Sequence, residues 1–137
     1  MIAGGFDPLL AILARKFDSA VFLELDHPAT QQVKCAALRK VGGADNLILI
    51  PVDLTKRSIG QALLGTVFSA SKPTLFIAEG ITLYLDEDEL TGLLREVRVH
   101  AHHHASSPVA TGGQVHCARF AVEHCFARAV GRGELAI

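Results

Sequence analysis

The chain has 137 residues, half of them hydrophobic, which is enough for one compact domain that buries roughly two thirds of its unfolded surface. Thirteen basic and fourteen acidic residues give a formal net charge of −1, so no overall field draws the protein to nucleic acid or anionic lipid. The apolar stretches are strand-sized, and we expect no signal peptide and no membrane-spanning segment. The odd number of cysteines, without CxxC spacing, favours reduced thiols and a cytoplasmic location; they are Cys35, Cys117 and Cys125.

Residues 2–5, an apolar stub with two glycines, directly precede a predicted helix over residues 7–17. In that helix the apolar residues recur at helical spacing, and the basic residues stand near the end, where cations favour the helix dipole. Pro8 suits the first turn, because the amide hydrogen that it lacks would have no partner there. We expect residues 2–5 to be the end of a first strand and its turn, with most of the strand's length missing.

Three apolar segments have the β-branched and aromatic composition of buried strands: AVFLEL over residues 20–25, NLILIPVDL over 46–54 and PTLFIAEG over 73–80. Helical patterns over residues 30–41, 58–68 and 86–97 alternate with them, which predicts an α/β protein with a mainly parallel sheet. Ser58 is placed to cap the helix over residues 58–68. The apolar faces expected in these helices are Val33, Ala36, Ala37 and Val41, then Ile59, Ala62, Leu63 and Val67, then Leu90, Leu93, Leu94 and Val97.

This pattern fails after Val99. The segment HAHHHASSPVATGGQ has no apolar period and is predicted to be a loop. Residues 115–130 are compatible with one further helix, and no further strand is evident. We therefore predict a partial α/β domain over residues 1–98 and a His-rich continuation over residues 99–137.

An acidic residue stands at the carboxyl end of each predicted strand: Asp26, Asp53 and Glu79. Ligands of open parallel sheets bind outside these ends, where Gly4 and Gly5 would also lie. Glycines permit a ligand to approach the backbone, and an acid about 20 residues further on is placed to accept hydrogen bonds from two ribose hydroxyls. Each acid alone is more simply a helix cap or a solvated loop end, but three at successive strand ends favour a nucleoside-bearing ligand.

The residues after the glycines indicate which nucleoside ligand is expected. The dinucleotide fingerprint GxGxxG is absent, because AGGFDP has two adjacent glycines followed by Phe6 and Asp7. An aspartate at a helix start would repel a pyrophosphate and would suit a cationic amino or sulfonium group, as in S-adenosylmethionine. The alternative is that Asp7 is simply the N-cap of the helix.

Four stretches resemble, in order and spacing, successive motifs of the leucine carboxyl methyltransferase-like family of S-adenosylmethionine-dependent O-methyltransferases. They are GGFDPLLAILAR, FLELDHPATQQVKCAAL, LILIPVDLT and PTLFIAEGITLYLDEDEL, and together they cover about residues 2–98. ELDHPATQ and EGITLYL are the most distinctive parts. The resemblance implies a Rossmann-like class I methyltransferase fold, with helices flanking a mainly parallel sheet.

The resemblance also implies roles for individual residues. Gly4 and Gly5 would lie under the methionine part of S-adenosylmethionine, and Asp26 would hold the ribose hydroxyls. Asp53 and Leu54 would contact the adenine. Glu79 would lie beside the cofactor and the acceptor pocket, and Tyr84 would form part of that pocket's wall. His27, in the same family-like turn as Pro28, is expected to be a loop residue rather than an acid or base.

The reaction implied is direct displacement onto an oxygen of a small molecule. A carboxylate acceptor is ionised at neutral pH and needs no base, whereas a hydroxyl acceptor needs one. No catalytic residue is nominated. The chain departs from the family by lacking the helical extension and full first strand before the glycines, and the further strands after the acidic helix. We therefore expect a fragment or an altered reading frame, whose activity does not follow from its ancestry.

The histidine cluster suggests a different function, a metal-binding or non-catalytic interaction protein. Imidazoles and thiolates bind zinc or nickel, but their spacing here is weak, and a solvated loop or out-of-frame translation is the simpler interpretation. No metal ligand is therefore assigned. The residues concerned are His100, His102, His103, His104, His116 and His124, with Cys117 and Cys125.

Overall fold

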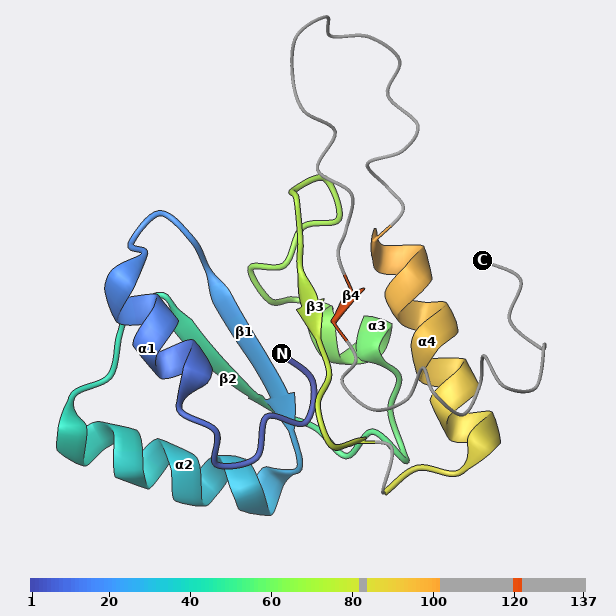
Figure 1. Ribbon diagram of the computed structural model, residues 1–137, viewed down its shortest axis with the longest axis horizontal. Coiled ribbons are helices and arrows are strands. Elements are labelled where there is room, and N and C mark those ends of the chain that lie inside the picture. The colour runs from blue at the N-terminus through green and yellow to red at the C-terminus, as the bar shows by residue number, and fades with distance from the viewer. Residues whose placement is uncertain (82–83, 102–119, 122–137) are drawn as a thin grey trace, which may run out of the picture.

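The computed structural model describes residues 1–81, 84–101 and 120–121, and it shows an α/β protein (Figure 1). The helices and strands alternate along the chain, as the hydrophobic pattern predicts. In order they are α1 (Leu9–Lys16), β1 (Phe22–Asp26), α2 (Pro28–Val41), β2 (Leu47–Pro51), α3 (Ile59–Leu63), β3 (Phe76–Ile77), α4 (Glu87–Ala101) and β4 (Phe120–Ala121).

Every strand pairing among the described residues is parallel. β1 pairs with β2, from Phe22 opposite Leu47 to Asp26 opposite Pro51. β3 pairs with β4, with Phe76 opposite Phe120. The predicted Rossmann-like architecture is confirmed. The two-residue strand β4 corrects the expectation of a helix through Phe120, because at this point the chain pairs with β3.

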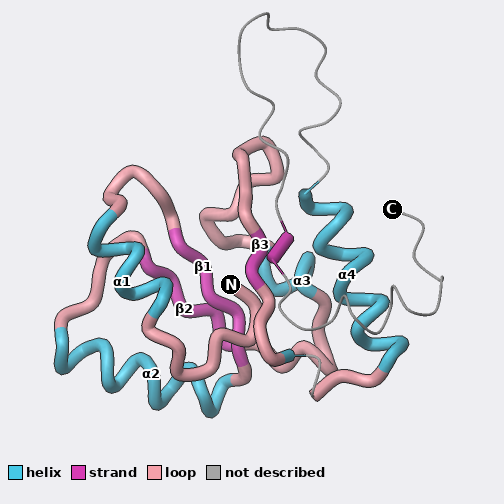
Figure 2. Tube along the Cα trace, viewed as in Figure 1, coloured by secondary structure: helices cyan, strands magenta, loops and turns pink. Residues whose placement is uncertain are grey.

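The first three residues join the two pairs of strands into one sheet. Ile2 forms parallel bridges to Leu25 and to Ala78. Its amide donates to the carbonyl of Ile77 at 2.7 Å, and the Ala3 amide donates to that of Leu25 at 2.7 Å. The sheet order is therefore β2, β1, residues 1–3, β3, β4, and the start of the chain lies between β1 and β3 (Figure 2).

α3 and α4 cover the main apolar core beside β3, whereas α1 and α2 lie near β1 and β2 (Figure 1). The predicted inward positions of α3 and α4 are largely confirmed. The buried core residues are Ile2, Leu25, Ile50, Val52, Ile59, Ala62, Leu63, Phe76, Ala78, Ile81, Leu93 and Val97.

The prediction that α2 buries its apolar face is wrong. Val33 is 57% exposed and Val41 is 67% exposed, while the buried side chains of this helix are Gln31 and Lys34. The strand beneath presents Glu24, which is fully buried, so the helix turns polar groups toward it. A buried carboxylate requires hydrogen-bonding partners, and this requirement outweighs the apolar pattern.

α3 begins as predicted but ends early. The hydroxyl of Ser58 accepts from the Gln61 amide, and the Gln61 side chain accepts from the Ser58 amide, which completes a capping box. The helix stops at Leu63, because Leu64 is extended and Gly65 has a φ of +75°. Val67, expected on the inner face, is therefore 58% exposed.

α4 is longer than its predicted range. A capping box between Asp86 and Glu89 precedes it, and the helix continues to Ala101. His100, predicted to begin the His-rich loop, is thus helical, and its ring lies 5.8 Å from that of Phe68 in an edge-on arrangement. No helix in the described part of the chain is long and apolar enough to cross a membrane.

The side chain of Asn46, directly before β2, forms hydrogen bonds with the end of α1 and the loop after it. Its side-chain amide lies 2.9–3.1 Å from the carbonyl oxygens of Ala14, Phe17 and Ala20. Asn46→Ala should lower the free energy of unfolding by about 1–3 kcal/mol, because these carbonyls lose a shared donor. Urea denaturation measures the change. Asp45→Ala, at an exposed neighbour, is the control, and an equal loss in both variants would contradict the assignment.

Candidate functional site

The sequence-predicted site residues follow the carboxyl ends of neighbouring parallel strands and so lie along one edge of the sheet. The Val52 amide donates to the Asp26 carbonyl at 2.8 Å, which places Asp53 next to the end of β1. The Gly5 amide donates to Asp26 Oδ2 at 2.6 Å. On the other side, the bridge from Ile2 to Ala78 precedes Glu79. The order along the edge is Asp53, Asp26, the glycines and Glu79.

The backbone turn over residues 3–7 has a conformation that depends on its glycines. Ala3 has a φ of 52° and Gly5 a φ of 53°, both in the left-handed region. A Cβ on Gly4 would lie 3.0 Å from Glu24 Cδ, whereas a Cβ on Gly5 would meet nothing within 4 Å. Glu24 and Met1 thus leave little room for a side chain at Gly4, and the space beside Gly5 is open to a ligand.

Asp26 organises the edge through its carboxylate. Oδ2 accepts from Gly5, and Oδ1 accepts from the His27 amide at 2.6 Å. A carboxylate oxygen has two acceptor positions, so each oxygen retains one for a ligand hydroxyl. The side chain of His27 accepts from the Ala29 amide and caps α2, in agreement with its expected loop role.

Asp53 is bound within its own loop. Oδ1 accepts from the Thr55 amide at 3.1 Å and from its hydroxyl at 2.6 Å, and Oδ2 pairs with Lys56 at 2.7 Å. The hydrogen bond from Lys56, followed by those from Thr55, lowers the pKa of Asp53 to about 2. The group remains ionised at neutral pH and shapes the loop that presents Leu54.

A hollow of about 250 Å³ lies between the loop after β2 and α4. Apolar side chains of Leu54, Leu85 and Leu93 line it together with charged groups that include Lys56 and Glu96. Of the predicted site residues, this hollow includes Leu54 alone. The hollow thus borders the adenine end of the predicted site and does not contain the glycines, Asp26 or Glu79.

Glu79 lies on the far side of the glycines, and Tyr84 follows it five residues later in the chain. Glu79 follows β3 and is exposed. Tyr84 is 83% exposed, and its amide donates to the Ile81 carbonyl in a turn. The side chains of Glu79 and Tyr84 are therefore both accessible to a ligand. Residues 82–83, between them in the chain, lie outside the described ranges.

Asp7 lies at the other end of the glycine turn, directly before Pro8, which is the N-cap residue of α1. Its Oδ1 accepts from the Leu9 amide, the first of the helix, at 2.8 Å. Asp7 is therefore not the N-cap itself, although its carboxylate binds an amide at the start of α1. Among the metal candidates, His100 is described and lies in α4, and the others fall outside the described residues. Within the described ranges no three His, Cys, Asp or Glu side chains are arranged to hold a metal.

A buried ion pair, which the hydrophobic pattern of the sequence does not predict, lies beneath the glycine turn. Lys34 Nζ lies 2.6 and 2.8 Å from the two carboxylate oxygens of Glu24, and the side chains are 5% and 0% exposed. Burial raises the pKa of Glu24, and Lys34 opposes this shift. The available signal was a glutamate between two leucines in a strand, with a lysine ten residues later in the next helix.

The amino group of Met1 belongs to the same layer. It donates to the Leu23 carbonyl at 2.6 Å. Burial lowers its pKa from 8.0 to about 6, and the nearby Glu24 partly opposes the change. The interior next to β1 thus holds the Lys34 ammonium, the Glu24 carboxylate and the Met1 amine.

The packing of Gly4 against Glu24 predicts a specific cost for an added methyl group. Gly4→Ala should lower the free energy of unfolding by about 1–3 kcal/mol, because its Cβ would press on Glu24 and on Met1 Sδ. Gly92→Ala is the matched control, since its Cβ would meet nothing within 4 Å and alanine favours the helix. Urea denaturation compares the two, and a neutral Gly4→Ala would contradict this packing.

The buried amine of Met1 predicts a pH-dependent contribution to stability. Between pH 6 and 8 the unfolded chain binds more protons than the folded chain, so this contribution increases with pH and is lost below pH 6. Its full size is at most about 2–3 kcal/mol. Urea denaturation from pH 5 to 9 should show that the free-amine chain becomes more stable relative to an N-acetylated chain as the pH rises from 6 to 8. A constant difference across the range would disprove it.

Comparison with known proteins identifies the family. The leucine carboxyl methyltransferase family model matches residues 1–98. Candidate S-adenosyl-L-methionine-dependent methyltransferases of Mycobacterium marinum and Mycobacterium ulcerans are 43% identical over 70 residues, and one of Mycobacterium tuberculosis H37Rv is 39% identical over 70. Each match covers 50% of this chain and 22% of the relative. With most of its length matched by the family model, the chain belongs to the leucine carboxyl methyltransferase family.

Proposed function

We propose that this chain carries the cofactor-binding elements of an S-adenosylmethionine-dependent O-methyltransferase. S-adenosylmethionine is the methyl donor of the family. The acceptor we propose is a carboxylate or hydroxyl of a small molecule. The matched segment covers 22% of the length of the mycobacterial relatives. Methyl transfer by this chain is therefore proposed together with cofactor binding.

The observation that carries the proposal is the hydrogen bond between Gly5 and Asp26, which lies at the carboxyl ends of the central strands of the sheet. It places an open glycine backbone directly beside a carboxylate that has acceptor positions left. One ligand of nucleoside and amino-acid character would use both features. The residues present therefore fit S-adenosylmethionine.

Each predicted residue has a distinct task in this proposal. Asp26 accepts hydrogen bonds from the ribose hydroxyls, and the turn at Gly4 and Gly5 lies against the methionine part. Leu54 contributes an apolar surface to the adenine, next to an Asp53 carboxylate that is already bound to Thr55 and Lys56. Glu79 adds an exposed negative charge on the other side of the glycines, which favours a cationic ligand.

S-adenosylmethionine supplies a methyl group already activated by its sulfonium. The protein's contribution is to hold an acceptor oxygen in line with that methyl group and to keep water away. Glu79 and Tyr84 are the residues that we propose for the acceptor side. A carboxylate acceptor would require no proton transfer, and we nominate no general base.

Calorimetric titration with S-adenosylhomocysteine tests the proposal. The folded chain should bind it, and Glu79→Gln should weaken binding by about tenfold through loss of a charge-assisted contact. Glu79 is chosen because it is exposed, whereas Asp26 also holds the backbone amides of Gly5 and His27.

Asp45→Asn is the matched control for this titration. It removes one exposed carboxylate from the loop before β2, at the opposite edge of the sheet. Its affinity should equal that of the unmodified chain. Absence of binding to protein that circular dichroism shows to be folded would refute the proposed function.

A further inference from the structure

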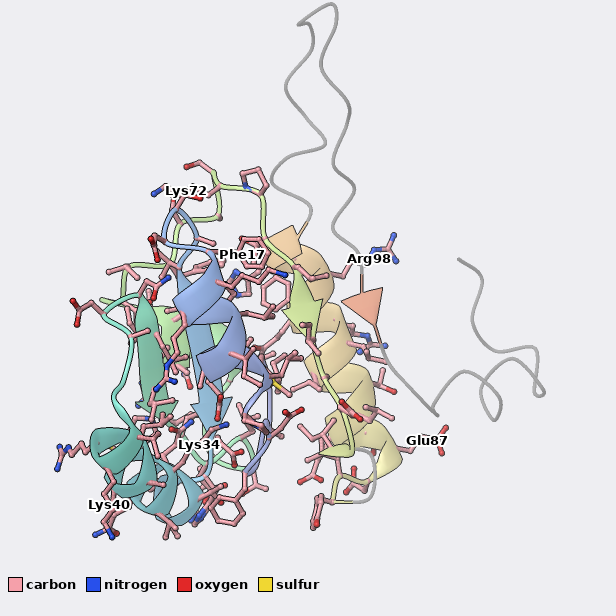
Figure 3. All side chains as sticks on the ribbon, turned by 60° about the vertical axis from the view of Figure 1, so that its left-hand side comes forward. Phe17, Lys34, Lys40, Lys72, Glu87 and Arg98 are labelled. Atoms are coloured by element: carbon pink, nitrogen blue, oxygen red, sulfur yellow. The ribbon has the colours of Figure 1, made fainter. Side chains whose placement is uncertain are left out.

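Lys34 directs its ammonium group at three acceptor atoms beneath the glycine turn. Two contacts reach the carboxylate of Glu24, and the third reaches the backbone carbonyl of Asp7 at 2.6 Å. Figure 3 shows Lys34 directed from α2 toward the end of β1, whereas Lys40 on the same helix points away from the protein. The lysine thus connects α2, β1 and the end of the turn.

The turn needs such an anchor because its backbone conformation is costly. Ala3 has a positive φ without being glycine, a conformation that persists when surrounding contacts determine it. The start of the turn is held by the Ala3 amide on Leu25, and its middle by the Gly5 amide on Asp26. At the end of the turn, the Asp7 carbonyl accepts a hydrogen bond from the Lys34 ammonium.

Burial prevents Lys34 from touching a ligand itself. Its side chain is 5% exposed, and Glu24, with which it pairs, is completely covered. Two well-packed apolar side chains would fill the same space with no charge to desolvate. Apolar side chains could not donate to the Asp7 carbonyl. The hydrogen bond to the turn is therefore what the lysine provides and an apolar residue would not.

We propose that Lys34 is a positioning residue for the cofactor, acting through the carbonyl of Asp7 to fix the Gly4–Asp7 turn in its binding shape. This inference rests on the proposed function. Glu24 supplies the counter-charge that allows the ammonium to be buried. A turn fixed before binding presents its backbone to the ligand without an ordering cost, and release of its end would weaken binding.

Two variants separate the contact with the turn from the ion pair. Glu24→Gln removes the charge of the ion pair but keeps a side-chain oxygen that can accept from Lys34, so the lysine can still donate to the Asp7 carbonyl. Glu24→Gln/Lys34→Met removes both and leaves no unpaired charge. Affinity for S-adenosylhomocysteine is measured by calorimetry, and amide exchange of Gly5 and Asp7 is measured by NMR without ligand.

The single variant should keep the affinity of the unmodified chain within about threefold, and the double variant should lose about tenfold or more. The Gly5 and Asp7 amides should exchange faster in the double variant, while amides of β2 remain protected. Asn46→Ala is the stability control, because it weakens the fold far from the turn and should leave affinity unchanged. If the first double variant does not fold, Glu24→Leu/Lys34→Met takes its place, because a fully apolar pair avoids buried polar groups.

The outcomes distinguish this inference from the proposed function. Binding by the unmodified chain with equal affinity in a folded double variant would overturn the positioning role alone. Equal loss of affinity in Glu24→Gln and the double variant would also overturn it, because the ion pair and not the Asp7 contact would then matter. Absence of binding by the unmodified folded chain would overturn the proposed function and this inference together.

Discussion

The pairing of Ile2 with Leu25 on one side and Ala78 on the other is the constraint on which the sheet depends. Without it, β1 with β2 and β3 with β4 are separate two-stranded pairs, and such pairs are marginal alone. The same three-residue segment sets the position of the glycines, because the chain leaves the sheet at Ala3 and turns directly beside Asp26. Sheet assembly and site formation therefore share one short piece of backbone.

The alternation of strands and helices, and the acids at strand ends, could be predicted from the sequence because both follow from local pattern. Apolar runs of strand length define the layers, and parallel pairing brings their carboxyl ends to one edge. The capping of α3 by Ser58 and the buried positions of Ile59 and Leu63 were predictable for the same reason.

The polar interior beneath the turn could not be predicted in this way. Val33 and Val41 make an apolar pattern on α2, yet the helix faces inward with Gln31 and Lys34, because Glu24 on the adjacent strand needs a cation. That choice depends on a contact between two elements and not on either sequence alone. The early end of α3 and the pairing of Phe120 with Phe76 are likewise decided by tertiary context.

Asp26 illustrates how a residue of the proposed site also belongs to the fold. Its carboxylate closes the turn through Gly5 and holds the start of α2 through His27. Selection for folding alone would therefore preserve this aspartate in a descendant that no longer binds a nucleoside. Glu79 is exposed, and the described part of the chain gives it no hydrogen bond or ion pair. Under the proposed role of Glu79, drift at this exposed glutamate among relatives would report loss of function, whereas an intact aspartate would report only that the protein still folds.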